Sequence, residues 1–162
     1  MIVVADASPL RYLVLIGEVE LLPALYGDVL IPSEVVNELT RPRTPESVRR
    51  WISGAPQWLQ VRVPFGSPSA FPDALGNGER EAIMLAEELH ADALLVDDWA
   101  ARQEAARRNL LVIGTLRILS SAAEKGMVDL PSAIARLRTT NFRASNERIQ
   151  SVLDADAKRK RR

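Results

Sequence analysis

The sequence contains no cysteine and a single histidine, and these two shortages exclude several kinds of site. Without cysteine the chain can form no disulfide, no zinc–thiolate centre and no thiol nucleophile. A Ser–His–Asp triad or a multi-histidine metal site would depend on His90 alone. His90 comes at the end of a predicted helix, where a cation suits the helix dipole, so we interpret it as an ordinary helix-end residue.

Long apolar runs and an excess of one charge are also missing. No apolar stretch approaches the roughly 18 residues of a membrane span, and no basic segment precedes Ile2. We therefore expect a soluble, cytoplasmic protein without a membrane partner. The formal net charge is zero, but residues 158–162 are all basic, so the rest of the chain is acidic. We expect a basic, disordered tail at residues 157–162 that attracts nucleic acid non-specifically.

The remaining residues have the size and apolar content of one domain. The chain has 162 residues and is 47% hydrophobic, and we expect a single domain over residues 1–156. Short apolar runs predict strands at residues 2–5, 28–31, 58–63, 93–96 and 110–113, the third of them at an edge. Helical patterns lie at residues 9–16, 18–26, 32–40, 46–52, 79–89, 99–108, 116–125, 131–138 and 146–155.

Strands that alternate with helices predict an α/β fold with three layers, α/β/α, around a central, mostly parallel sheet. One segment interrupts the alternation. Residues 64–78 are dense in proline, glycine, serine and asparagine and form the longest irregular stretch. A loop of that length in a compact domain is usually mobile or functional.

Asp6 ends the first predicted strand, and Ser8–Pro9 is typical of a helix start. A carboxylate therefore stands where a buried strand gives way to a helix. In open α/β sheets ligands bind at this edge. The pair Asp97 and Asp98 repeats the arrangement after the fourth predicted strand, although either residue could simply cap the helix that follows.

Glu79 lies within the apolar stripe of its predicted helix, unlike the other glutamates there. An acid in the first turn can be explained by the helix dipole alone. Because an unpaired buried charge is expensive, its position in the stripe favours a metal ligand. Glu38 flanks the apolar stripe of another helix, and its residues alone indicate only a solvated glutamate.

Carboxylates without histidine or cysteine suit a hard cation such as Mg²⁺ or Mn²⁺. Such an ion activates water for phosphodiester hydrolysis without a protein nucleophile. Ser8 and Thr115 each follow a strand end and could orient a ligand or water, or cap a helix. Arg102 could contact a phosphate or form an ion pair with Asp98 at i, i+4. No glycine-rich phosphate loop follows a strand.

Four segments resemble, in order, the signature blocks of PIN-domain proteins. They read Val-Ala-Asp-Ala-Ser-Pro-Leu, Ile-Pro-Ser-Glu-Val-Val-Asn-Glu-Leu, Gly-Glu-Arg-Glu-Ala-Ile-Met-Leu-Ala and Leu-Leu-Val-Asp-Asp-Trp-Ala-Ala-Arg. The similarity extends from Val4 to about Leu137. With Ile-Gly-Thr-Leu at residues 113–116, it is closest to a VapC-like prokaryotic branch.

The resemblance implies a metal-dependent ribonuclease, often a homodimer and often the toxin of a toxin–antitoxin pair. It assigns metal ligation to four positions, namely Asp6, Glu38, Glu79 and either Asp97 or Asp98, with a slight preference for Asp97. Two residues depart from the family pattern. Glu79 stands where many relatives have aspartate, and Arg117 stands where close relatives have glycine.

Three functional hypotheses follow. The leading one is an endoribonuclease that uses Mg²⁺ or Mn²⁺, hydrolyses RNA and serves as the toxin of a type II toxin–antitoxin pair. The second is a non-catalytic PIN-like module that binds RNA or protein. A phosphate-accepting signalling domain ranks last because no lysine follows a strand end.

Overall fold

The computed structural model describes residues 1–67 and 70–162, which form a parallel sheet with helices on both faces. The strands are β1 (Val3–Ala5), β2 (Val29–Pro32), β3 (Leu59–Arg62), β4 (Ala93–Leu95) and β5 (Val112–Ile113), in the order β3-β2-β1-β4-β5. β1 is central and pairs in parallel with β2 on one side and β4 on the other. The chain therefore proceeds outward from β1 in both directions, and ligands of such sheets bind where the direction reverses.

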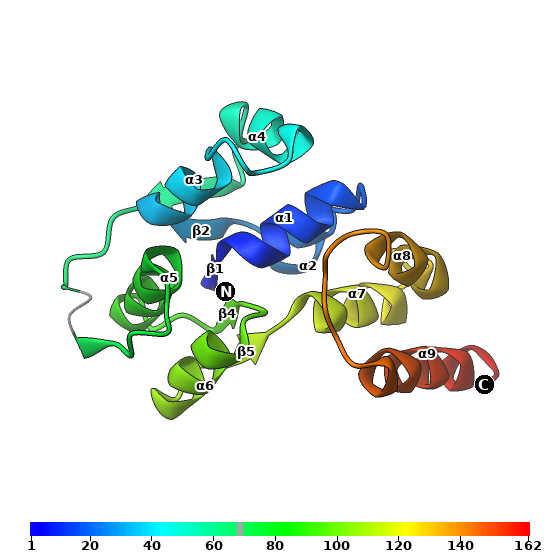
Figure 1. Cartoon of the computed structure of the whole chain (residues 1–162). Helices are drawn as coiled ribbons and strands as arrows, with labels where there is room; N and C mark the ends of the chain where they lie inside the picture. Colours follow the sequence, from blue (N-terminus) through cyan, green and yellow to red (C-terminus); the bar gives the residue numbers. More distant parts are fainter. Residues whose placement is uncertain (68–69) are drawn as a thin grey trace.

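The helices form two layers over this sheet (Figure 1). They are α1 (Ala7–Leu15), α2 (Leu21–Tyr26), α3 (Ser33–Leu39), α4 (Glu46–Ser53), α5 (Asn77–Glu88), α6 (Trp99–Arg107), α7 (Thr115–Glu124), α8 (Leu130–Leu137) and α9 (Asn146–Lys160). Side chains alternate across β1: Val3 and Ala5 belong to the larger core with α1 and α7, whereas Val4 packs with α5 and α6. The predicted three-layer α/β/α fold is confirmed.

Three helix starts differ from the sequence prediction by two residues or more. α2 begins at Leu21 rather than at residue 18, and the other two lie beside the carboxyl ends of the strands. α1 begins at Ala7, and Ser8 lies inside the helix without making a capping hydrogen bond. α5 begins at Asn77, because Glu79 accepts a hydrogen bond from the Gly76 N–H and closes the first turn. The predicted irregular segment, residues 64–78, therefore ends two residues early, and its residues 68–69 lie outside the described part of the chain.

The expectation of a disordered tail at residues 157–162 is wrong for residues 157–160, which continue α9. The cause is Asp156, a buried carboxylate that forms ion pairs with Arg159 at 2.7 Å and Lys160 at 2.9 Å. The basic residues thus lie in the last turn, where cations also complement the helix dipole. Only Arg161 and Arg162 follow the helix.

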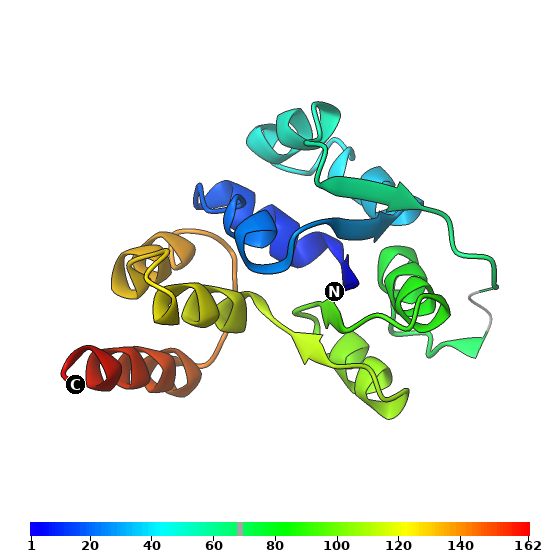
Figure 2. The ribbon, with the colours of Figure 1, turned by 180° about the vertical axis from the view of Figure 1, so that it is seen from behind.

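The C-terminal helices extend the fold beyond the β5 side of the sheet. Helices α8 and α9 pack on α7, and the C-terminus lies at the far end of α9 in both views (Figures 1 and 2). The connection between α8 and α9 returns to α1, where the Tyr12 hydroxyl donates to Asn141 Oδ1 at 3.0 Å. The ring of Phe142 packs edge-on against Tyr12, with centroids 5.1 Å apart. These contacts place the connection beside the carboxyl end of β1.

Among the described residues, no helix combines the length and the apolar character that crossing a bilayer requires.

Candidate active site

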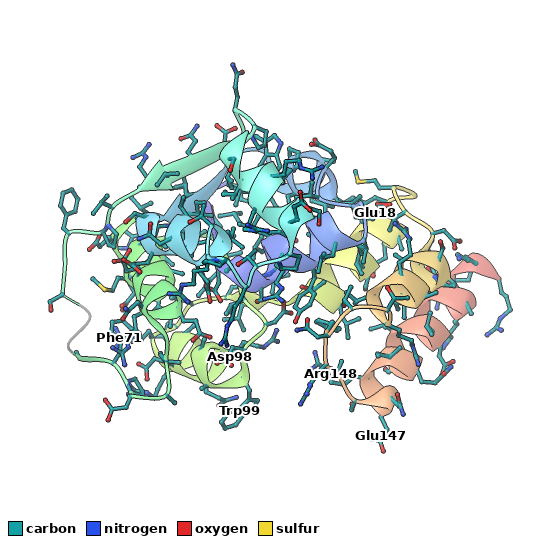
Figure 3. The ribbon with its side chains drawn as sticks, turned by 45° about the horizontal axis from the view of Figure 1, so that its top comes forward. Glu18, Phe71, Asp98, Trp99, Glu147 and Arg148 are labelled. Carbon is teal, nitrogen blue, oxygen red and sulfur yellow. The ribbon has the colours of Figure 1, made fainter. Side chains whose placement is uncertain are left out.

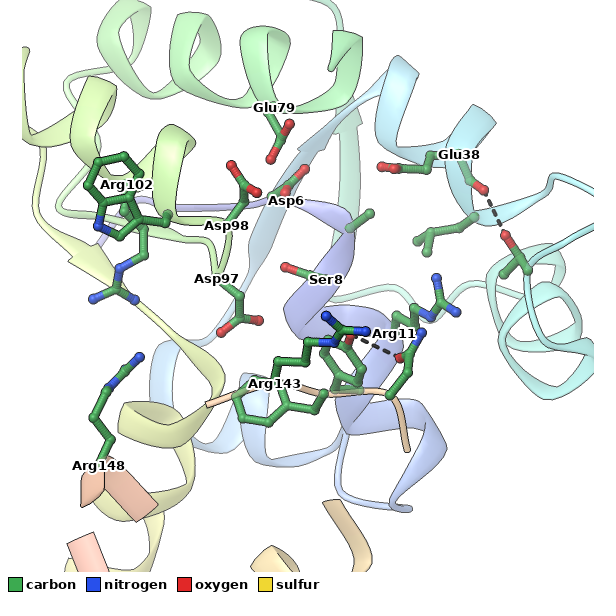
Figure 4. A pocket seen from close by; sticks show the side chains of 17 residues that line it. Asp6, Ser8, Arg11, Glu38, Glu79, Asp97, Asp98, Arg102, Arg143 and Arg148 are labelled. Carbon is green, nitrogen blue, oxygen red and sulfur yellow. Dashed lines mark hydrogen bonds between the residues drawn. The ribbon is translucent and has the colours of Figure 1, made fainter. Parts of the chain in front are cut away.

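All five acidic residues singled out in the sequence line one cavity of about 530 Å³ at the carboxyl ends of β1 and β4 (Figure 4). The acids are Asp6, Glu38, Glu79, Asp97 and Asp98, and the cavity also contains Arg11, Arg102, Arg143 and Arg148. Ser8 and Arg102 line it as the sequence suggested. Thr115 lies next to it and contacts Asp97.

Asp6 follows β1 directly and is 4% exposed. Its backbone N–H donates to the Leu95 carbonyl of β4 at 2.9 Å, which fixes the carboxylate at the strand end. Its Oδ1 atom is buried and has no hydrogen-bond partner among the described residues. Burial raises the pKa of Asp6 well above its ordinary value, and the charges of Glu79, Glu38 and Asp97 raise it further. A cation beside Asp6 would offset both effects.

Glu79 serves the helix and the cavity together. Its Oε1 accepts the hydrogen bond from the Gly76 N–H at 2.8 Å, so Glu79 does stabilise the start of α5, as one of the two interpretations of the sequence proposed. The same side chain lies against Asp98, and burial together with that neighbour raises the pKa of Glu79 to about 7, although the Gly76 hydrogen bond opposes the rise.

This raised pKa predicts a stability that depends on pH in the metal-free protein. Glu79 is protonated in both states below about pH 4.5, whereas between that pH and about 7 only the folded state holds the proton. The free energy of unfolding should therefore fall as pH rises from 5 to 8, by about 2 kcal/mol after allowance for solvent screening. Urea titrations with a chelator present measure it.

Glu79→Gln is the control for this measurement, because glutamine does not titrate and retains the hydrogen bond to Gly76. The variant should lose much of the decline, and the remainder should come from Asp6 and Glu38, whose pKa values burial also raises. An equal decline in both proteins would contradict the assignment to Glu79.

Glu38 reaches the cavity from α3, and only the family resemblance singled it out. Its Oε2 lies 3.1 Å from the point where a Cβ on Gly78 would stand, and Asp6 Oδ1 lies 3.7 Å from the same point. Glycine at this position in α5 therefore leaves open a space that both carboxylates face. Burial raises the pKa of Glu38, while Arg41 and Arg11 oppose the rise.

Asp97 and Asp98, which follow β4, have different hydrogen-bond partners. Asp97 accepts hydrogen bonds from the Thr115 backbone N–H at 2.8 Å and from its hydroxyl at 2.7 Å, one on each carboxylate oxygen. Asp98 caps α6 through Oδ2, which accepts from the Ala101 N–H at 3.0 Å, and its carboxylate lies beside Glu79 and Asp6 (Figure 4). Thr115 is fully buried and holds Asp97 rather than capping a helix.

The donor set fits a hard divalent cation, although Glu79, Asp97 and Asp98 already accept hydrogen bonds. In the part of the chain that the structure describes, no three acidic side chains are grouped closely enough to hold an ion as they stand. The buried atoms Asp6 Oδ1, Ser8 Oγ and Arg11 Nε nevertheless lack partners within residues 1–67 and 70–162. Buried polar groups are almost always paired, so a ligand in the space at Gly78 would supply the partner that Asp6 Oδ1 lacks.

The arginines of the cavity are not neutralised by its acids. Arg102 donates to the Val96 carbonyl at 3.3 Å, and the alternative ion pair with Asp98 is not formed. Within the described residues, none of the four arginines makes an ion pair. Sequence reasoning missed three of them. Arg11 lies one turn after Ser8, a spacing that could have indicated it, whereas nothing in the sequence pattern places Arg143 or Arg148 there.

Comparisons with known proteins agree with the fold. A solved PilT N-terminus domain protein from the hyperthermophilic archaeon Sulfolobus solfataricus P2 is 22% identical, and the match covers 75% of this chain and 93% of that one with a TM-score of 0.51. That likeness concerns the fold. Among curated proteins no sequence matches the chain. A family model described as PIN domain matches residues 2–158, nearly the whole chain, and the protein therefore belongs to the PIN-domain family, whose members are generally nucleases.

Proposed function

We propose that this protein is an endoribonuclease that uses Mg²⁺ or Mn²⁺ to hydrolyse RNA. The observation that carries the proposal is Asp6 Oδ1, a buried carboxylate oxygen without a partner among the described residues, at the end of the central strand. Glu38 and Glu79 approach it from α3 and α5, and all three have raised pKa values for which burial is the largest cause. Perturbed acids gathered in a cavity are typical of a functional site.

The residues of the chain would share the work as follows. Asp6, Glu38, Glu79 and Asp98 would hold the ion through their oxygens. When bound, such an ion makes water a stronger nucleophile and stabilises the charge that develops on a phosphodiester. Arg11 and Arg143 line the same cavity and would bind the phosphate oxygens through charge-assisted hydrogen bonds.

Asp98, rather than the slightly preferred Asp97, is our choice for the fourth ligand. Both oxygens of Asp97 accept hydrogen bonds from Thr115, whereas Asp98 lies against Glu79. Asp98→Asn tests this choice without loss of the helix cap, because asparagine caps as well as aspartate. Loss of even an outer-shell partner of a metal ligand lowers metal affinity by about 10- to 100-fold. We therefore expect the affinity for Mn²⁺ to fall at least about tenfold, and calorimetry measures it. Asp97→Asn is the matched control, and a larger loss in that variant would reverse the choice.

Titration with Mn²⁺ tests the metal site and decides between catalysis and a non-catalytic binding module. The hydrogen bonds that already occupy Asp97 and Glu79 favour that second candidate. At 100 times its Kd, an ion that binds only the folded state stabilises it by about 2.7 kcal/mol, which would raise the Tm by roughly 5–10 °C. No shift at millimolar Mn²⁺, together with no cleavage of single-stranded RNA, would favour the binding module.

The VapC-like role is a narrower proposal. As the toxin of a type II pair, the protein would arrest growth when expressed alone, and co-expression of the gene immediately upstream would relieve the arrest. The cognate antitoxin would then be a small protein, and this chain would be a homodimer. Growth curves and sedimentation velocity test these two points, and normal growth at high expression would contradict the toxin role.

A further inference from the structure

A second cavity, of about 580 Å³, adjoins the active-site cavity on the β5 side. Arg102 of α6 and Arg148 of α9 line both cavities, so the two spaces meet at this pair of arginines. Figure 4 draws both side chains on the same side of the acidic cluster, and Figure 3 shows Arg148 on the same face of the molecule as Asp98 and Trp99. We call the second cavity the β5 groove.

The β5 groove has the opposite charge balance to the active site. Besides the shared arginines, Arg117 of α7 and Lys125, which directly follows that helix, line it, and Glu124 is its only acid among the described residues. None of these four cations forms an ion pair within the described part of the chain. The active-site cavity, in contrast, contains five acids. A polyanion that extends from the active-site cavity past Arg102 and Arg148 would therefore enter the basic β5 groove.

The β5 groove also offers apolar surface. Leu25, Tyr26, Leu111 and Ile113 line it, and Leu111 is 62% exposed. Trp99 lines the active-site cavity together with Arg102 and is 74% exposed. Proteins that bind single strands combine a basic groove with aromatic side chains on which unpaired bases stack, a role open to Tyr26 and Trp99. In a duplex the bases are stacked on one another and could not use this surface.

The position of the groove is fixed by the fold. Ser145 caps α9, where its hydroxyl accepts the Arg148 N–H at 3.1 Å, so Arg148 lies in the first turn of a capped helix. Arg117 lies in the first turn of α7, two residues after the Thr115 that holds Asp97. The residue that departs from the family pattern at position 117 thus lines the groove.

We propose that the β5 groove binds the stretch of single-stranded RNA that continues from the scissile phosphate, with Arg117 and Lys125 as phosphate contacts. The proposal rests on the proposed ribonuclease function for the identity of the ligand. The test of the groove measures RNA binding alone, so that the groove proposal and the ribonuclease proposal can fail separately.

The test compares two double variants that remove the same charge. Arg117→Ala with Lys125→Ala alters only the β5 groove, whereas Arg62→Ala with Arg138→Ala removes two exposed cations that line neither cavity. Fluorescence anisotropy of a labelled 12-nucleotide uridine oligomer is followed at several salt concentrations with a chelator present. The groove variant should bind about tenfold more weakly, and its salt slope should be smaller by about 1.4, or 0.7 per lost phosphate contact. The control should change less than twofold.

Cleavage assays distinguish RNA binding in the β5 groove from phosphodiester hydrolysis in the active-site cavity. Hydrolysis of a nucleoside p-nitrophenyl phosphate, which is too short to reach the groove, should be unchanged in the groove variant, whereas KM for the oligomer should rise. If no substrate is cleaved but the groove variant alone loses RNA binding, the proposed ribonuclease function is wrong and the proposal that the β5 groove binds RNA is supported.

Three results would contradict the proposal that the β5 groove binds RNA. They are unchanged RNA binding and salt slope in the groove variant, equal losses in both double variants, and no binding of the oligomer by the parent protein. If RNA binding is unchanged but the groove variant alone loses self-association in sedimentation, the surface is a protein interface instead. Equal thermal midpoints of the two double variants establish that both are folded.

Discussion

Asp6→Asn should abolish metal-dependent RNA cleavage while leaving the fold intact. We expect kcat to fall by about 10³-fold or more, which corresponds to about 4 kcal/mol of lost transition-state stabilisation. Asp6 is the most buried acid of the cavity, and its Oδ1 is the oxygen that lacks a partner among the described residues. An amide keeps the shape of the side chain but removes the charge that a divalent ion requires.

The same variant should be at least as stable as the parent protein when metal is absent. Burial and neighbouring carboxylates disfavour the ionised form of Asp6, as its raised pKa indicates, and asparagine removes that repulsion. The stabilisation by Mn²⁺ should disappear at the same time. Circular dichroism, thermal unfolding with and without Mn²⁺, and cleavage of a labelled RNA measure the three effects.

Asp73→Asn provides the matched control, because Asp73 is exposed and lies outside the cavity. That variant should retain both cleavage and the response to Mn²⁺. Full activity of Asp6→Asn would remove Asp6 from the metal site, and with it the observation on which the proposed function depends.

Gly78→Ala should separate stability from activity. The new methyl group would stand 3.1 Å from Glu38 Oε2 and 3.7 Å from Asp6 Oδ1, so it fills the space that both carboxylates face. The Glu38 side chain must then move away. The shift that the contact requires is a few tenths of an ångström. Because displacement of a catalytic group by about 1 Å can lower a rate by about 10²-fold, we expect a loss of about tenfold.

Stability should change in the other direction. Gly78 lies in the first turn of α5, where alanine restricts the unfolded chain and stabilises by about 0.4–1 kcal/mol. Strain at Glu38 would reduce this gain without reversing it, because a flexible side chain can move. Urea unfolding and steady-state cleavage measure the two quantities on the same preparation.

Gly54→Ala is the matched control, since a Cβ there meets nothing within 4 Å. It should leave cleavage unchanged. If Gly78→Ala cleaves RNA at the parent rate, the space between Asp6 and Glu38 is not where the ion binds.

The fold could be predicted because its signals are local. The apolar runs that became β1 and β4 are buried on both faces, as the parallel arrangement requires, and helical periodicity between them was clear. The errors occurred where a single contact overrides the local pattern. Asp156 extends α9 into a basic segment that composition alone marked as disordered.

Local sequence signals singled out most, but not all, of the acids that line the cavity. Asp6, Asp97 and Asp98 follow strands, and Glu79 lies within an apolar stripe, so each has a local signal. Glu38 has none, and only its family block singled it out. The division of labour between Asp97 and Asp98 depends on Thr115, which is 18 residues farther along the chain than Asp97.

The sequence by itself determined the order of strands and helices, and therefore that Asp6 stands where a buried strand ends and a helix begins. Only the tertiary structure decided what surrounds that carboxylate. Segments distant in sequence make the space at Gly78, the group of arginines in the cavity and the β5 groove. The α8–α9 connection reaches the cavity through Tyr12. Periodicity reports which face of an element is buried, whereas the neighbours of that face depend on how the elements pack.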